Sequence, residues 1–152
     1  MSTSIRSQAV AAVVIALATD PSPATGGTWR ARTEQFTQDE SPAFNVWPID
    51  EKYSEDANDR DTLAVTLSLR VQCLVRSGAE VDLAAELLAV FAHQQIMADE
   101  TLGGIVQDAR LTGSKWTIAE GGQDVVALDL DFDVMYQISR ADPTVNQFYQ
   151  SS

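Results

Sequence analysis

Three aspartates near the end of the chain have the type and spacing that most resemble a site. They are Asp129, Asp131 and Asp133, separated by apolar residues. In a β-strand they lie on one face at intervals of about 7 Å, which is too spread for one compact calcium shell without further donors. The segment also lacks the glycine and the distal glutamate of a calcium loop. We interpret it as an acidic stripe that faces solvent or a channel, and an acidic metal-dependent enzyme stays an alternative.

The other residues that could carry chemistry form no recognisable set. The glycine pairs lack the spacing of phosphate-binding loops, and no Cys/His cluster is available for zinc. Cys73, the single cysteine, falls on the apolar side of a predicted strand, so we expect a buried structural thiol. His93, the single histidine, has no partner nearby in sequence, and we expect a surface or packing role. We therefore predict no catalytic residue, no cofactor and no bound metal.

Two long alternating segments would position the aspartates. In Leu63–Val75 the odd-numbered residues are apolar and the even-numbered ones mostly polar, which is typical of a strand with one buried face. Asp124–Gln137 repeats the pattern, with the aspartates on its polar face. If the two strands are neighbours, Arg70 and Arg76 face the aspartates and help to set the register. We expect Leu67 and Leu130 in the core.

The rest of the chain supplies two helices and shorter strands. One helix is predicted at Thr3–Ala18, and a second begins after a capping-box pattern at Ser77–Glu80 and ends near Met97. Apolar residues at helical spacing predict the core-facing stripe of the second helix, which comprises Leu83, Leu87, Val90, Phe91 and Met97. The shorter strands are predicted at Trp29–Phe36, Phe44–Ile49, and Ile105–Leu111 with Trp116–Ala119 as a hairpin. This order predicts an α+β fold, a mostly antiparallel sheet with two helices on one face.

The length and net charge of the chain limit the classes of protein to which it can belong. The 152 residues are most simply one domain, 1–152, and carry a net charge of −12. Such a charge argues against a protein that wraps duplex DNA, because that binding neutralises phosphates. Two polar segments stand out, an acidic loop at Asp50–Asp61 and a polar C-terminal tail at Arg140–Ser152. The residues predicted to contact partners or other subunits are Asp50, Glu51, Glu55, Asp56, Phe148 and Tyr149.

The start of the chain has two interpretations. Arg6, the following apolar run and the small residues Ala16-Leu17-Ala18 resemble a short signal peptide. A small secreted domain is therefore an alternative. Against it, Arg6 is the only basic residue before the run, and the run contains a single leucine. We favour a packed helix.

Three segments carry a resemblance that covers nearly the whole chain. They are Glu80-Val81-Asp82-Leu83 with Glu86, then Leu102-Gly103-Gly104-Ile105-Val106, and Val126–Tyr136 followed by Arg140-Ala141-Asp142-Pro143. With the order of elements, they resemble the tail terminator family of long-tailed bacteriophages, which includes minor tail protein U and related tail-completion proteins. The acidic Asp50–Asp61 loop has no counterpart in this pattern.

The resemblance implies a structural virion protein without catalytic residues. Such a subunit forms a homohexameric ring that caps the tail tube, stops its polymerisation and joins it to the head. The implied partners are other copies of the chain, the major tail tube protein and a head-completion or neck protein. DNA passes through without specific binding, and no membrane is involved. The implied location is the head-proximal end of the tail, with assembly in the host cytoplasm. A neck or head-completion connector of similar fold is the alternative, and Asp129, Asp131 and Asp133 are the candidate lumen lining.

Overall fold

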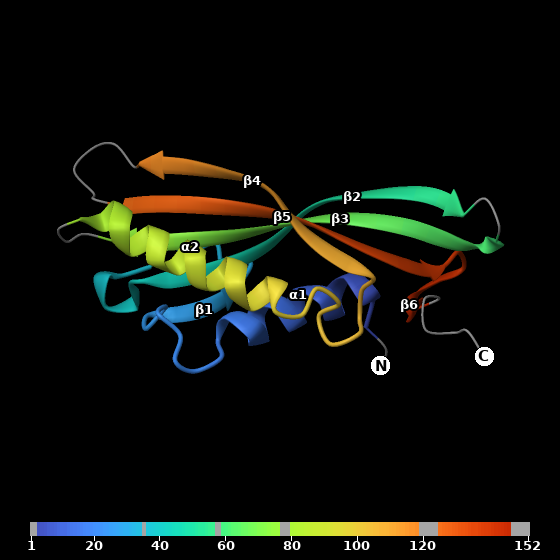
Figure 1. Cartoon of the computed structure of the whole chain (residues 1–152), viewed down its shortest axis with the longest axis horizontal. Coiled ribbons are helices and arrows are strands. Elements are labelled where there is room, and N and C mark those ends of the chain that lie inside the picture. Colours follow the sequence, from blue (N-terminus) through green and yellow to red (C-terminus); the bar gives the residue numbers. More distant parts are fainter. Residues whose placement is uncertain (1–2, 35, 57–58, 77–79, 119–124, 147–152) are drawn as a thin grey trace.

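The computed structural model describes residues 3–34, 36–56, 59–76, 80–118 and 125–146. Its helices are α1 (Ile5–Leu17) and α2 (Val81–Met97), with a short 3-10 helix at Gln38–Glu40. Its strands are β1 (Gly27–Arg30), β2 (Ala43–Asp56), β3 (Asp59–Arg76), β4 (Asp108–Ile118), β5 (Val125–Ser139) and β6 (Asp142–Asn146). Figure 1 shows an elongated molecule with the β2–β3 hairpin at one end and β1 with the start of α2 at the other.

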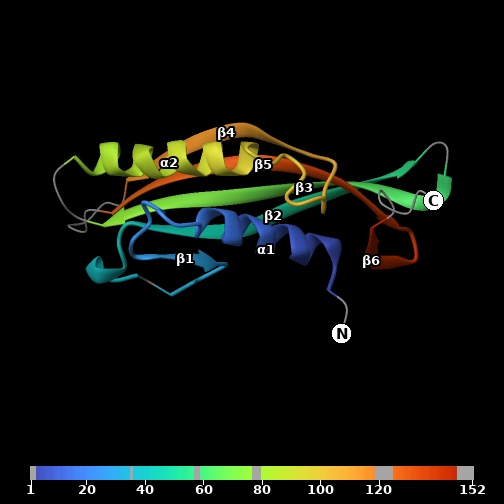
Figure 2. The same cartoon turned by 60° about the horizontal axis from the view of Figure 1, so that its bottom comes forward.

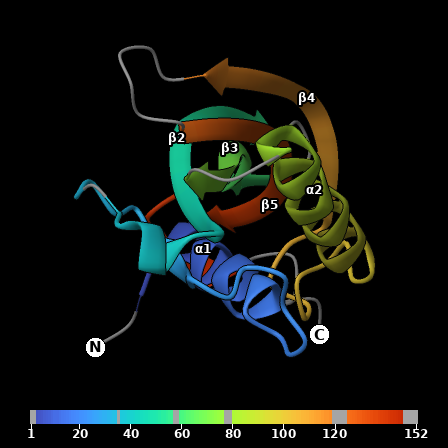
Figure 3. The same cartoon turned by 90° about the vertical axis from the view of Figure 1, so that its left-hand side faces the viewer.

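One twisted sheet joins all the described strands. Its order is β1-β2-β3-β5-β4, and β6 pairs with the end of β5. Only β1 and β2 pair in parallel, and every other pair is antiparallel. Figures 2 and 3 show α1 and α2 along the same side of the curved sheet. The α+β fold with two helices on one face of a mostly antiparallel sheet is therefore confirmed.

The alternation of the two long strands is confirmed in phase and in pairing. Strand β3 lies directly beside β5, with Leu67 opposite Val134 and Val71 opposite Leu130. Leu67 is fully buried and Leu130 is 5% exposed, both within the core between the sheet and the helices. Because side chains alternate along a strand, this register leaves the even-numbered residues of β3 and the odd-numbered residues of β5 on the opposite face.

Helix α1 is part of this core, as the packed-helix interpretation expects. The Ser4 hydroxyl caps its N-terminus by accepting a hydrogen bond of 3.1 Å from the Ser7 amide. The buried residues recur at helical spacing and are Ile5, Ala9, Val10, Val13 and Leu17. They bury one side of the helix against the sheet and the other helix.

Helix α2 corrects the predicted stripe. Leu83, Leu87 and Val90 are 50%, 67% and 47% exposed, whereas Phe91 and Met97 pack at the margin of the core. The buried side consists of Ala85, Leu88, Ala89, Ala92 and Ile96. The helix carries two apolar stripes, and the one rich in alanine faces the sheet because small side chains let the helix lie close to the strands.

The start of α2 also differs from the prediction. Glu80 occupies the N-cap position itself, in a left-handed conformation with φ of 57° and without a side-chain capping bond. Asp82 lies inside the first turn. The predicted capping box is therefore wrong, because that motif places the glutamate inside the helix, three residues after the N-cap. Ser77 lies outside the described residues.

Three segments predicted as turns or loops belong to strands. The hairpin predicted at 105–119 is wrong, because β4 runs through the expected turn with a bulge between Leu111 and Gly113. The bulge absorbs the extra residue, and the Thr112 hydroxyl donates a hydrogen bond of 3.1 Å to the Asp131 carbonyl. The acidic loop is wrong as well, since β2 continues to Asp56 and β3 begins at Asp59. Within the polar tail, Asp142–Asn146 forms β6.

Candidate functional site

The predicted acidic stripe lies on the sheet face opposite the helices. We call this surface the polar sheet face. Its central residues are Ser68, Arg70, Gln72, Asp129, Asp131 and Asp133, with Trp47 and Lys115 on the flanking strands. The Arg70 Nε donates to Asp131 Oδ1 at 2.9 Å and lies 3.8 Å from Asp129 Oδ2. The Ser68 hydroxyl donates to Asp133 Oδ1 at 3.1 Å. The predicted pairing with Arg70 is confirmed.

Arg76 does not contribute to the stripe in the predicted way. Its Nη1 donates to the Phe36 carbonyl at 3.1 Å, and its guanidinium carbon lies 5.8 Å from the centre of the Phe36 ring. The strand register explains this, because Arg76 lies opposite Val125, four residues along β5 from Asp129.

The three aspartates have different environments. Asp131 and Asp133 are partly exposed, whereas Asp129 is only 7% exposed. Its Oδ1 has no hydrogen-bond partner among the described residues, and burial raises the pKa of this carboxyl. With Arg70 and Lys115 beside them, these carboxylates form a face of mixed charge rather than a uniformly acidic one. The described residues hold no group of three His, Cys, Asp or Glu suited to a metal ion.

Two glutamates in the acidic end of the β2–β3 hairpin make contacts within their own chain. Glu51 accepts hydrogen bonds from Arg6 of α1, from the Tyr53 hydroxyl at 2.9 Å and from the Tyr136 hydroxyl at 3.1 Å. Burial and the Glu51 carboxylate raise the pKa of Tyr136. Glu55 pairs with Arg140 at 3.3 Å. These two glutamates, predicted as partner contacts, therefore have partners within the chain.

The other predicted contact residues are less constrained by the described structure. Asp50 is exposed on β2. Asp56 is the last residue of that strand. Phe148 and Tyr149 lie outside the described residues. Asn146 of β6 donates to the Ile105 carbonyl at 2.8 Å, so the described part of the predicted tail is bound to the body of the domain.

A second surface consists of exposed apolar residues on α2 and β4. We call it the α2–β4 apolar surface, and it comprises Leu83, Leu87, Val90, Trp116 and Ile118. Trp116 and Ile118 are 46% and 70% exposed. Glu86, Val90, His93 and Trp116 line a depression between the helix and the strand. Val90 also lines a second depression with Leu87 and Phe91, so it connects Leu87 to the side of the helix that faces Trp116. Contiguous exposed apolar residues mark an interaction site more often than scattered ones do.

His93 and Cys73 are positioned as expected. His93 is exposed, and its ring lies 6.5 Å from the Phe132 ring, so its role is packing at the surface. Cys73 is fully buried in β3, and burial raises the pKa of its thiol to about 12. A thiol with such a pKa is a poor nucleophile at neutral pH.

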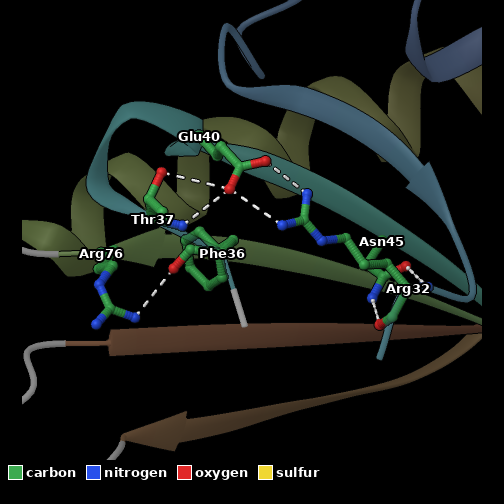
Figure 4. A network of polar contacts seen from close by, with 6 residues as sticks. All are labelled: Arg32, Phe36, Thr37, Glu40, Asn45 and Arg76. Carbon is green, nitrogen blue, oxygen red and sulfur yellow. Dashed lines mark hydrogen bonds and ion pairs between the residues drawn. The ribbon is translucent and has the colours of Figure 1, made fainter. Parts of the chain in front are cut away.

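A polar network fixes the segment between β1 and β2 against the sheet (Figure 4). The Arg32 guanidinium donates a bidentate pair of hydrogen bonds to the Glu40 carboxylate at 2.6 and 3.0 Å. Glu40 also accepts a hydrogen bond from the Thr37 amide at 3.0 Å. These contacts lower the pKa of Glu40 to about 2. The buried Asn45 side chain bonds both backbone groups of Arg32. The network therefore stabilises the start of β2, and its role is structural.

The comparisons with known proteins identify a shared fold. No family model matches the chain, and no curated protein matches it either. A solved chain from the virion of a native gene transfer agent particle superposes with a TM-score of 0.51. The two chains are 14% identical, and the match covers 82% of this chain and 91% of that one. No described helix is both long and apolar enough to cross a membrane.

Sequence reasoning found the polar sheet face and missed the α2–β4 apolar surface. The signal for that surface was present, because Leu83, Leu87 and Val90 recur at helical spacing. Hydrophobic periodicity marks an apolar stripe without telling whether its own sheet or another molecule covers it. The exposure of Trp116 and Ile118 was not predicted, because the sequence pattern divided β4 into the two strands of a hairpin.

Proposed function

We propose that this chain is a structural virion protein that caps the end of a phage-type tail tube. In this role it stops tube polymerisation, joins the tube to the head or neck and has no catalytic activity. The observation that carries the proposal is the fold shared with a chain of a gene transfer agent virion, over most of both chains. The tail-terminator resemblance of the sequence narrows that structural role to tail completion.

The distribution of surfaces supports assembly into a ring. The α2–β4 apolar surface leaves large apolar side chains in solvent when the chain is alone. Copies around a rotation axis would each contact two neighbours through different surfaces. We take the number of copies to be six, as the resemblance implies. The proposed partners are therefore other copies, the major tail tube protein and the head-completion or neck protein.

In this ring the polar sheet face is the candidate lining of the channel. No helix of the described residues packs on it, whereas α1 and α2 cover the opposite face. Asp131 and Asp133 are the members of the stripe exposed enough to face DNA. Only charges within about 8 Å of DNA act on it at physiological salt. Because Arg70 and Lys115 lie beside the aspartates, we expect the lining to repel DNA weakly.

The proposal is tested in the particle that carries this protein. Removing the gene should give tails of uncontrolled length that fail to join heads, and supplying the wild-type chain should restore them. A structure of the assembled tail should place the chain as a ring at the end of the tube next to the head. Tails of normal length on joined particles without the protein would refute the proposed role.

The channel lining has its own test. Replacing Asp131 and Asp133 with lysine should slow DNA passage while rings still assemble. A matched control is Glu34→Lys, which changes an exposed carboxylate away from the sheet. If the ring structure places Asp131 and Asp133 on the outer wall or in subunit interfaces, the lining hypothesis is wrong.

A further inference from the structure

The sheet ends in β4 on one border and in β1 on the other. Among the described residues each of these strands pairs on one side only, β4 with β5 and β1 with β2. Figure 1 shows β4 and β1 on opposite borders of the same half of the sheet. An edge strand presents backbone donors and acceptors that can pair with another strand. Both borders can therefore pair with a second copy of the chain.

The strand registers place these two edges at the same level of the sheet. Gly27–Arg30 of β1 lies beside residues 43–46 of β2, which lie opposite residues 71–74 of β3. Residues 71–74 lie opposite 127–130 of β5, and those lie opposite 114–117 of β4. A rotation about an axis along the strands adds no shift along that axis. It can therefore bring the two edges of adjacent copies together and close a ring.

The two edges also run in opposite directions. Strand β1 is parallel to β2, and every neighbouring pair from β2 through β3 and β5 to β4 is antiparallel. Strands β1 and β4 are therefore antiparallel to each other. A copy related by the same rotation keeps its strand directions, so its β1 would lie antiparallel to β4 of the first copy.

The backbone groups of β1 point to its open edge at two positions. The Ala31 amide, directly after β1, donates a hydrogen bond of 2.8 Å to the Val46 carbonyl of β2. Successive residues of a strand direct their backbone groups to opposite sides. Trp29 therefore faces β2, whereas Thr28 and Arg30 direct their amides and carbonyls to the outer edge.

The backbone groups of β4 are open at the matching positions. The Asp131 carbonyl accepts the hydrogen bond from the Thr112 hydroxyl, so Asp131 directs its backbone groups towards β4. Gly113 lies opposite Asp131 and therefore faces β5. By the same alternation, Ser114 and Trp116 direct their amides and carbonyls away from the sheet.

The side chains at the matched positions are complementary. Arg30 lies beside the core residue Val46 and Trp116 lies opposite the core residue Leu128, so both point to the helix side. Glu86 of α2 lines the same depression as Trp116. In the continued sheet, Arg30 of the next copy would lie near this carboxylate and near the exposed indole. Both groups attract a guanidinium.

We propose that β4 of one copy pairs antiparallel with β1 of the next copy, with Trp116 opposite Thr28 and Ser114 opposite Arg30. In both pairs the two residues direct their backbone groups at each other, so the pairs would exchange about four hydrogen bonds. The contact keeps the helices of all copies on one wall of the ring and the polar sheet face on the other. This inference rests on the proposed function, since it names the contact through which the subunits of the ring would join.

Disulfide formation between two variants tests the pairing. Arg30→Cys and Ser114→Cys place thiols at exposed positions, so both variants should fold as the wild type does, which circular dichroism checks. Directly opposite residues in such a pair have Cα atoms about 5.5 Å apart, which suits a disulfide. Under mild oxidation in the presence of tail tubes, we expect a covalent dimer when the two variants are mixed and none when either is treated alone. The buried Cys73 leaves the wild-type chain as a blank.

Thr117→Cys is the matched control on β4. Thr117 is exposed, lies opposite Ala127 and points to the polar sheet face, so this variant should form no dimer with Arg30→Cys. An equally strong dimer with the control would overturn the proposed register.

Each other outcome rejects a definite statement. A dimer of Ser114→Cys alone would show β4 pairing with β4, and a dimer of Arg30→Cys alone would show β1 pairing with β1. Either result overturns the proposed contact, as does the absence of a dimer in the mixture. Wild-type rings at the tube end with no mixed dimer would reject the edge pairing and leave the proposed function intact. Protein that stays monomeric in the assembled tail would reject the ring itself.

Discussion

The same substitution at two neighbouring leucines of α2 should cost much stability at one and almost none at the other. Leu88 is 1% exposed and packs in the core, whereas Leu87 is 67% exposed. Leu88→Ala removes buried methyl groups and leaves a cavity, which costs about 2–5 kcal/mol. Leu87→Ala removes side-chain atoms that are mostly in water, so we expect a change within about 0.5 kcal/mol. Alanine has the higher helix propensity in both cases, which makes the pair matched.

The assay is urea unfolding followed by circular dichroism, at a protein concentration where the chain is monomeric. In thermal unfolding, a domain of this size should lose roughly 4–20 °C with Leu88→Ala and almost nothing with Leu87→Ala. Leu87→Ala should instead weaken ring assembly, because Leu87 belongs to the α2–β4 apolar surface. Equal losses for the two variants, or a larger loss for Leu87→Ala, would refute the orientation of the helix.

The remaining predictions concern two core leucines, the buried thiol and two carboxylates outside the core. Leu67→Ala and Leu130→Ala should each cost about 2–5 kcal/mol in urea unfolding, and losses below about 1 kcal/mol at both would contradict the strand phase. The Cys73 thiol should react with a colorimetric disulfide reagent only when the protein unfolds, so rapid reaction of the native protein would count against its burial. The raised pKa of Asp129 means that its ionised form opposes folding, so Asp129→Asn should be at least as stable as wild type at pH 7, with the gain disappearing below pH 3.8; a clear loss at pH 7 would contradict this. The lowered pKa of Glu40 has the opposite sign, so the stability lost in Glu40→Gln should be fully present above pH 4.5 and should vanish as the pH falls towards 2; a difference that does not depend on pH would argue against the Arg32 contact.

The sequence predicted the long strands because their alternation is local information. In β3 and β5 every second residue is apolar along the buried face, so that face follows from the pattern alone. The pairing of Arg70 with the aspartates followed from the same alternation once the strands were taken as neighbours. The first helix was predicted from its apolar run and its terminal residues.

The other elements depended on tertiary contacts. Thr112–Lys115 has the composition of a turn, but β5 extends alongside and offers a partner for every residue except the bulge. The acidic residues from Asp50 to Asp61 suggested a loop. In the structure Arg6 neutralises Glu51 and the Tyr136 hydroxyl donates a hydrogen bond to it, so β2 continues through this acidic segment. In α2 the choice between two apolar stripes depends on which one fits the sheet, which periodicity cannot decide.

The most direct test of the proposed function is an image of the purified wild-type protein mixed with tail tubes. We predict rings of six copies that sit on one end of the tube and stop its growth. Mass measurement of the isolated rings gives the number of copies independently. Tubes that continue to grow in the presence of excess protein, with no density at their ends, would contradict the account.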